Sequence, residues 1–262
     1  MPSAKPFCVC GMNQIGDIWW TEWRKVDGIT IFHVNLTPNA RREYLAHTLL
    51  DAAEKDSFDR FLSDRARREF VLCRAALRVN IAGILGCSES ELSFGHLEFG
   101  KPYAKVADRS VELNFNVSHS GRHGLIALSY RDCVGIDLEV RAARSDLDGI
   151  GSFVYSREEQ RLLAEATGRE KIRLFYRLWS MKEALIKALG TGFSLSPSAF
   201  EIPEPVLRGA RSCQVRFPHL PSQQWQLLDL GERRFAAALA YRSSPLIAGP
   251  PIPVAINSRG QH

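Results

Sequence analysis

Two acidic residues on one expected strand are the first candidates for chemistry. In the stretch CVGIDLEV, residues 133–140, one residue separates Asp137 from Glu139. Because side chains alternate between the faces of a strand, both carboxylates would point the same way, roughly 6.5 to 7 Å apart. They would repel each other unless a cation lay between them, and a hard ion such as Mg²⁺ prefers oxygen ligands. With Gly135 leaving room for a ligand on the same face, the pattern indicates a metal site, although the outward face of an antiparallel strand shows the same alternation.

A glutamate and a lysine one helical turn apart add a third acid and a cation. The stretch FYRLWSMKEALIKALG, residues 175–190, has apolar residues at helical spacing and ends at Gly190, a typical C-terminal cap. Glu183 and Lys187 lie on another face of this helix, where Glu183 could meet a metal ion or a proton and Lys187 an anion. For these two residues alone, an exposed pair worth roughly 0.2 to 0.5 kcal/mol is the simpler interpretation.

A third polar group, Ser118-His119-Ser120, ends an expected strand just before Gly121. The triplet suggests a serine hydrolase, but adjacent strand residues point to opposite faces and no nucleophile elbow surrounds them. Alone, His119 is typical of a structural histidine or a hydrogen-bond donor. The chain also has no GxGxxG motif after a strand and no Walker A loop, so the common nucleotide-binding loops are excluded.

The elements that must position these residues follow from periodicity and turn signals. The expected strands are at 28–36, 115–118, 125–130, 133–140, 225–230 and 233–241. We expect 125–130 and 133–140 to form a hairpin through Arg131 and Asp132, and 225–230 to pair with 233–241. Helices are expected at about 41–54, at 57–85 and at the stretch that carries Glu183. Each half of the chain thus offers strands and one long helix, which predicts two α/β halves of similar size.

The positive net charge favours anionic partners but does not identify one. The 262 residues include 34 Lys+Arg and 29 Asp+Glu, a net charge of +5. Arg67, Arg74 and Arg78 share one face of the helix at 57–85, which is either an anion-binding surface or a solvated one. A nucleic-acid-binding function rests only on this face and on the basic charge.

Composition predicts a cytoplasmic protein without a membrane span. No run of 18 apolar residues occurs, and the first residues lack the pattern of a signal peptide. The six cysteines show no CxxC spacing, so we expect reduced thiols rather than a disulfide framework or a zinc site. Four prolines beyond Ser243 predict an extended or mobile tail.

Three segments together resemble the 4'-phosphopantetheinyl transferases, in particular the larger, two-half members that activate peptide synthetases and other carrier proteins. They are FNVSHSG (115–121), VGIDLEV (134–140) and WSMKEALIKALG (179–190). The resemblance covers roughly residues 28 to 242. It implies an α/β (α+β) fold of two pseudo-symmetric halves, each with a small, mainly antiparallel sheet and a long helix, and an active site at their interface. The expected boundaries are 1–124, 125–243 and a tail at 244–262.

The activity that the resemblance implies is transfer of the 4'-phosphopantetheine arm from coenzyme A to a serine of an acyl or peptidyl carrier protein, with release of 3',5'-ADP. Mg²⁺ would be required and coenzyme A would be the co-substrate. Carrier proteins would be the partners of a monomer that binds neither nucleic acid nor membrane.

Residue roles carried over by motif match are expectations of the same kind. Asp137, Glu139 and Glu183 would hold Mg²⁺, and Glu183 would also take the serine proton, directly or through water. A carboxylate on a metal is a weak base, so Glu183, Glu158 and a water stay open for that role. The coenzyme contacts would be Lys187, His119 and Ser118 at the phosphates, Lys101 and Pro102 beside the adenine, and Arg78 and Lys55 at the 3'-phosphate.

Two other classes of function remain as alternatives. One is a non-catalytic coenzyme A or nucleotide-binding module of the same fold, and the other is the nucleic-acid-binding protein that the charge allows. Binding of coenzyme A without modification of any carrier would favour the first. Competition by polynucleotides with a steep salt dependence would favour the second.

Overall fold

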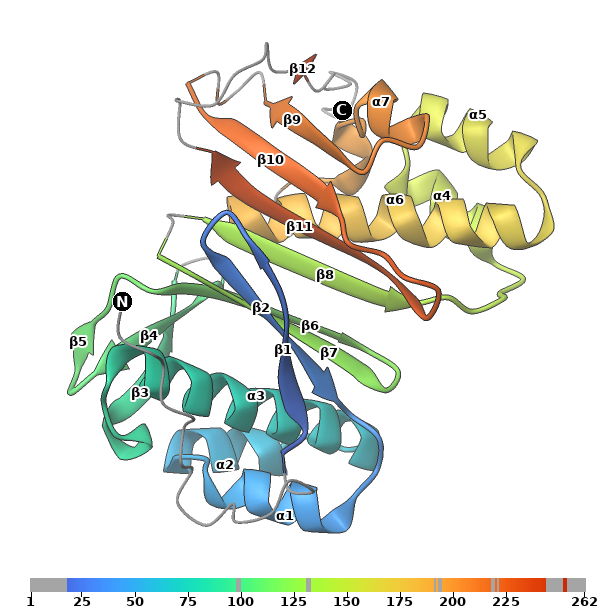
Figure 1. Cartoon of the computed structure of the whole chain (residues 1–262). Coiled ribbons are helices and arrows are strands. Elements are labelled where there is room, and N and C mark those ends of the chain that lie inside the picture. Colours follow the sequence, from blue (N-terminus) through green and yellow to red (C-terminus); the bar gives the residue numbers. More distant parts are fainter. Residues whose placement is uncertain are drawn as a thin grey trace.

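Four layers make up the protein: helix, sheet, sheet and helix (Figure 1). The computed structural model of the chain describes residues 18–97, 100–130, 133–190, 192, 195–217, 220, 222–243 and 252–253. The two sheets face each other in the middle, and one helix of 22 residues covers each outer face. The structure is therefore the mixed α/β fold with two halves that the sequence predicts.

The first half is a four-stranded sheet in the order β1-β2-β7-β6, packed on helix α3. A separate three-stranded sheet, β3-β4-β5, lies beside it. The elements of this half are β1 (Trp20–Val26), β2 (Ile29–Asn35), α1 (Ala40–Thr48), α2 (Ala52–Asp59), α3 (Asp64–Leu85), a 3-10 turn (Glu89–Glu91), β3 (Leu92–His96), β4 (Pro102–Val106), β5 (Arg109–Ser110), β6 (Asn114–Ser120) and β7 (His123–Ser129).

The second half is a five-stranded sheet in the order β12-β9-β10-β11-β8, packed on helix α6. The elements of this half are β8 (Val134–Val140), α4 (Leu147–Val154), α5 (Arg157–Glu165), α6 (Gly168–Leu189), a 3-10 turn (Pro197–Ala199), α7 (Glu204–Leu207), β9 (Ser212–Arg216), β10 (Gln224–Asp229), β11 (Phe235–Ser243) and β12 (Ile252–Pro253). The predicted pairing of 225–230 with 233–241 is confirmed as β10 and β11. Apart from β12, the predicted tail lies outside the described residues.

The predicted hairpin of 125–130 and 133–140 is wrong. Strand β7 pairs with β6 and β2, whereas β8 pairs with β11 in the other sheet. Both strands are largely buried, and a strand is buried in this way whether its neighbour belongs to the same sheet or to a sheet stacked on it. The side-chain pattern alone therefore does not distinguish the two arrangements. The expected boundary between residues 124 and 125 also falls inside β7, and we propose the division between β7 and β8 instead.

Helix boundaries in the first half also differ from the prediction. Capping side chains divide the segment into three helices, because the side chain of Asp51 accepts from Glu54 N at the start of α2 and that of Ser63 accepts from Ala66 N at the start of α3. The helix predicted from residue 57 therefore starts at Asp64. Strand β1, which the sequence analysis missed, pairs with β2.

Apolar side chains from both sheets make the core between the halves. Ile31 and Leu125 of the first sheet pack in one cluster with Ile136, Leu138 and other residues of the second. At the β6 edge of the first sheet this inner face becomes polar, and side chains of β6 accept hydrogen bonds from the backbone amides of β8. The halves are thus joined by apolar packing in the middle and by polar contacts at one side.

Helix α6 touches strand β8 directly at Gly135. A Cβ placed on Gly135 would lie 2.2 Å from Ala184 O and 2.3 Å from Ala188 N. The sequence analysis interpreted this glycine as room for a ligand, and that interpretation is wrong, since the helix backbone occupies the space. The close contact fixes α6, with Glu183 and Lys187, against the strand that carries Asp137.

Substitution of Gly135 by alanine should push α6 away from β8. We expect Gly135→Ala to lower the free energy of unfolding in urea by about 2 kcal/mol or more, because the contact is with backbone rather than with a flexible side chain. The control is Gly149→Ala in α4, where a Cβ meets nothing within 4 Å. An unchanged stability of Gly135→Ala would contradict this account of the interface.

Two histidines of the first sheet meet Phe235 of the second. His33 Nε2 lies 2.9 Å from His123 Nδ1, and both rings pack on the Phe235 ring. Burial, followed by the charges of His123 and Arg234, lowers the pKa of His33 to about 4, against the opposing effect of Glu232. Both imidazoles are therefore neutral in the folded protein at neutral pH.

Acidification should weaken this contact. Between pH 6.5 and about 4, His33 is protonated in the unfolded chain but stays neutral in the folded protein, so protonation favours unfolding. The stability associated with neutral His33 is therefore complete above pH 6.5 and is lost as the pH falls toward 4. We expect the free energy of unfolding in urea to fall between pH 7.5 and pH 5 by about 1 kcal/mol more in the parental protein than in His33→Gln. This difference takes into account that His33 is partly exposed to solvent. Equal losses in the two proteins would contradict this assignment.

Candidate functional site

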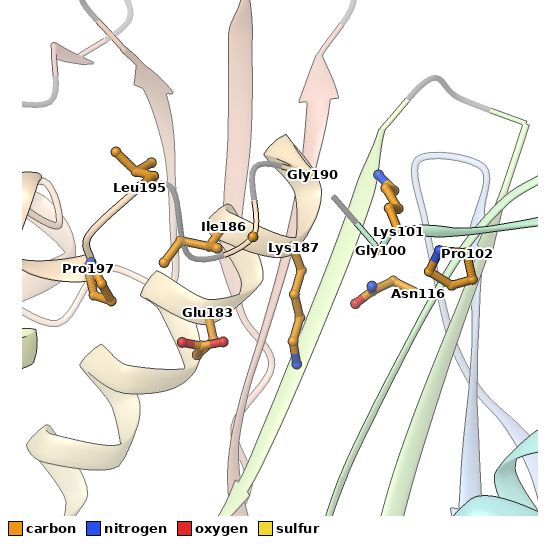
Figure 2. Close-up of a pocket in the computed structure, with 11 residues that line it drawn as sticks. Gly100, Lys101, Pro102, Asn116, Glu183, Ile186, Lys187, Gly190, Leu195 and Pro197 are labelled. Carbon is orange, nitrogen blue, oxygen red and sulfur yellow. The ribbon is translucent and has the colours of Figure 1, made fainter. Parts of the chain in front are cut away.

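A pocket of about 260 Å³ opens between the two halves (Figure 2). One wall comes from the first half and the other from α6 and the segment after it. The lining residues are Gly100, Lys101, Pro102, Asn116, Glu183, Ile186, Lys187, Gly190, Gly192, Leu195 and Pro197. Four side chains singled out from the sequence therefore line one pocket, although two distant segments of the chain supply them: Lys101 and Pro102 in the first half, and Glu183 and Lys187 on α6.

The ammonium of Lys187 is the centre of a hydrogen-bonded cluster. It lies 2.6 Å from Asp137 Oδ1 and donates to Ser118 Oγ at 3.2 Å. Ser118 Oγ in turn donates to Asp137 Oδ1 at 2.9 Å. Asp137 is buried while Lys187 is half-buried, so the pair connects the protein interior to the pocket. The arrangement leaves a cation at the pocket wall, where an anionic ligand could displace part of its contact with the acid.

Two more carboxylates feel the charge of Asp137. Burial, together with repulsion by Asp137 and Glu183, raises the pKa of Glu139 to about 7, whereas Ser120 and Lys187 oppose this shift. Burial and Asp137 also raise the pKa of Glu183, against the attraction of Lys187. Asp137, Glu139 and Glu183 thus form a region of excess negative charge that one lysine only partly compensates.

A preformed metal site is not present among the residues that the structure describes, since no three Asp, Glu, His or Cys side chains there stand close enough to hold an ion. The donor set nevertheless fits a hard cation. Asp137 Oδ2 is buried and has no hydrogen-bond partner within the described part of the chain. A buried, unpartnered carboxylate oxygen is costly unless a donor or a cation reaches it. The predicted binding of Mg²⁺ therefore stays a proposal that the donor chemistry supports.

His119 points to the other side of β6 from Ser118, toward helix α3. Its Nδ1 lies 3.5 Å from Glu69 Oε2, and Glu69 is also bonded to Arg65. Burial lowers the pKa of His119, as do Lys187 and Arg65, while Glu69 opposes them. It lines a second pocket of about 220 Å³, which shares Pro102 and Asn116 with the first. His119 thus lies beside the main pocket rather than in its wall.

Lys101 links the two halves at the rim of the main pocket. Its Nζ lies 3.4 Å from Ala188 O in the last turn of α6, and burial lowers its pKa. Pro102 follows it at the start of β4. This pair faces the end of α6 across the pocket, as Figure 2 shows.

Arg78 does not lie where a phosphate could reach it. Its side chain is 2% exposed, and its guanidinium bonds Asp51, Glu54 and the carbonyl oxygens of Glu89 and Leu92. The prediction that Arg78 contacts the 3'-phosphate is therefore not supported. The basic helical face did not reveal that α2 folds back to bring two acids onto it.

Two further predicted residues lie outside these pockets. Lys55 is on α2 and lines neither of them, and Glu158 pairs with Arg161 on the exposed side of α5. Glu69 and Asn116 were not singled out from the sequence, and Ser120 was named only as part of the polar triplet, without a role at the site. The alternation of polar residues in FNVSHSG was a signal for Asn116 and Ser120, whereas no motif marked Glu69.

A structural role for Arg78 predicts a loss of stability. We expect Arg78→Gln to lower the free energy of unfolding by about 3 kcal/mol, because it leaves buried Glu54 without its closest cation. The matched control is Arg161→Gln, which removes exposed pairs with Glu158 and Glu165 and should change stability by less than about 0.5 kcal/mol. A stable Arg78→Gln variant that fails to bind coenzyme A would restore the phosphate role.

Two α/β halves with one pocket between them, lined by charged side chains from both, define a two-half α/β protein with a composite site. The sequence model of the 4'-phosphopantetheinyl transferase superfamily matches residues 133–240, and that of the 4'-phosphopantetheinyl transferase N-terminal region matches 36–131. The first model thus falls on the second half and the other on the first half.

Several individual proteins are similar to this chain. The 4'-phosphopantetheinyl transferase Sfp of Bacillus subtilis (strain 168) is 32% identical over 165 residues, 58% of this chain and 71% of Sfp. The 4'-phosphopantetheinyl transferase HetI of Nostoc sp. (strain PCC 7120) is 35% identical over 159 residues, 60% of this chain and 66% of HetI. The protein slr0495 of Synechocystis sp. (strain PCC 6803) is 33% identical over 147 residues, 56% of this chain.

The chain belongs to the 4'-phosphopantetheinyl transferase family. The matched segments span 59% of slr0495 and 66% of HetI, so they leave part of each relative unmatched. Within the part of the chain that the structure describes, no helix is both long and apolar enough to cross a membrane.

Proposed function

We propose that this protein transfers the 4'-phosphopantetheine arm of coenzyme A to a serine hydroxyl of an acyl or peptidyl carrier protein. The observation that carries the proposal is the cluster of Lys187, Ser118 and Asp137 beside Glu183, at a pocket with walls from both halves. A pyrophosphate needs cationic and hydrogen-bonding partners, and a hydroxyl that attacks it needs a nearby base. Family membership supports the same reaction.

Binding of coenzyme A would use the charges of the pocket. Lys187 would bind the pyrophosphate, exchanging part of its contact with Asp137 for one with the ligand, and Ser118 and His119 would assist. Lys101 and Pro102 would border the adenine. Lys55 remains a candidate for the 3'-phosphate, whereas the internal bonds of Arg78 argue against that role for it.

The reaction would break the phosphoanhydride bond of the pyrophosphate and form a phosphate ester with the serine. The serine oxygen attacks the β-phosphorus, the bond from that phosphorus to the bridging oxygen breaks, and 3',5'-ADP leaves with the electron pair. Glu183 faces the pocket and would accept the serine proton, directly or through water. Lys187 would stabilise the charge on the leaving oxygen.

Asp137, Glu139 and Glu183 would hold Mg²⁺, a role that the unpartnered Oδ2 of Asp137 supports. When bound, the ion would neutralise negative charge on the pyrophosphate. Excess basic charge would attract acidic carrier proteins. We further propose a monomer, because one chain supplies both walls of the pocket. A cytoplasmic location is also proposed, supported by cysteines without CxxC spacing.

Intact mass spectrometry of an apo carrier protein tests the proposal. With coenzyme A and Mg²⁺ the carrier should gain the mass of one phosphopantetheine arm, and a chelator should prevent the gain. Binding of coenzyme A without a mass gain on any carrier would instead favour the non-catalytic module. Displacement of coenzyme A by polynucleotides would favour the nucleic-acid-binding alternative.

Three substitutions should abolish transfer without unfolding the protein. We expect Asp137→Ala, Glu183→Ala and Lys187→Ala each to reduce the rate of carrier modification by about 100-fold or more, since each removes charge at the reacting pyrophosphate. Lys171→Ala is the matched control, because Lys171 is on the same helix but pairs with Asp148. Circular dichroism confirms folding, and parental rates in all three variants would refute the site.

A further inference from the structure

Strand β6 binds the edge of β8 through side chains instead of through a backbone ladder. Asn116 Oδ1 accepts from Ile136 N at 2.8 Å, Ser118 Oγ from Leu138 N at 3.2 Å, and Ser120 Oγ from Val140 N at 3.1 Å. The three acceptors alternate along β6 and the three amides alternate along β8. The same kind of contact therefore recurs three times between the two halves, from Ile136 to Val140 of the acidic strand.

These contacts fix the direction in which each serine donates. A hydroxyl has one proton, and the backbone N–H already occupies an acceptor position on its oxygen. Ser118 donates its proton to Asp137 Oδ1 at 2.9 Å, and Ser120 donates to Glu139 Oε2, also at 2.9 Å. Each acid is thereby held through one oxygen. For Asp137 the other oxygen, Oδ2, is the buried atom without a partner among the described residues.

Without the hydrogen bond from Ser120, electrostatic repulsion would favour movement of the Glu139 side chain. Asp137 and Glu183 repel it, and it lines a hollow of about 470 Å³ together with two cations, Arg65 and Arg144. A glutamate side chain has three rotatable bonds, so it could turn from the other acids toward that hollow. Ser120 contacts Glu139 alone of the three acids, whereas Ser118 is shared between Asp137 and Lys187.

We propose that Ser120 is a positioning residue that holds Glu139 beside Asp137 and so sets the affinity of the site for a divalent cation. The proposal rests on the proposed function, in which these acids hold Mg²⁺. Hydrogen bonds to a metal-binding carboxylate orient it, and their loss typically weakens metal binding by 10- to 100-fold.

Binding of Mn²⁺, followed by electron paramagnetic resonance of the full-length protein, tests this role. We expect Ser120→Ala to bind Mn²⁺ about 10-fold or more weakly than the parental protein. Ser120→Thr keeps the hydroxyl and should bind within a few-fold of the parental value. Affinity for coenzyme A without metal should stay within a few-fold in both variants, because Ser120 does not line the pocket between the halves.

A control separates positioning from lost stability. Ser156 is buried and its hydroxyl also accepts a backbone amide, that of Glu159, but it bonds none of the three acids. Ser156→Ala should lower stability and leave Mn²⁺ binding unchanged. Unweakened binding by Ser120→Ala, equal weakening by Ser156→Ala, failure of threonine to restore binding, or no binding by the parental protein would each overturn the inference.

Failure of this inference is distinguishable from failure of the proposed function. The parental mass-gain assay tests the function by itself. A parental protein that modifies carriers while Ser120→Ala binds Mn²⁺ normally would leave the transferase standing and refute only the role of Ser120. Mn²⁺ binding that depends on Ser120, without any carrier modification, would support the positioning role and refute the transferase.

Discussion

The edge of strand β8 is the constraint on which the rest of the structure depends. Its amides must find acceptors because they are buried between the halves, and an unsatisfied buried N–H costs about 1 to 3 kcal/mol. β11 pairs with one edge of the strand, and Asn116, Ser118 and Ser120 supply acceptors at the other. The side chains that satisfy the backbone also hold two of the three acids. The same hydroxyl groups thus join the two halves and position the acidic side chains of the site.

Charge in the site is balanced internally only in part. Lys187 compensates Asp137 at 2.6 Å, while Glu139 and Glu183 remain in a region that disfavours their ionised forms. Lys187 thus offsets part of the negative charge of the three acids. The same lysine faces the pocket, so a pyrophosphate and its counter-cation would replace one set of ionic contacts by another.

Local chemistry was predictable from the sequence and long-range partners were not. Glu183 and Lys187 follow from helical spacing, and the alternation around Asp137 gave its strand. Gly135 indicated a close approach, but only the fold reveals that the approaching atoms belong to α6. For Arg78, the decisive acids lie 24 and 27 residues earlier in the chain, where no local pattern links them to α3. The wrong prediction of a hairpin between 125–130 and 133–140 has the same cause, because the pairing partners of β7 and β8 depend on how the two sheets pack.

The two long helices, α3 and α6, differ in what they contribute to the protein. Both have 22 residues, both end at a left-handed glycine, and each covers the outer face of a sheet. Only α6 presents an acid and a lysine to the main pocket, whereas α3 mostly packs and bonds to its neighbours. A substitution on the pocket side of α6 therefore alters the charges of the main pocket directly, whereas α3 acts on that pocket only through the sheet and the side chains that it supports.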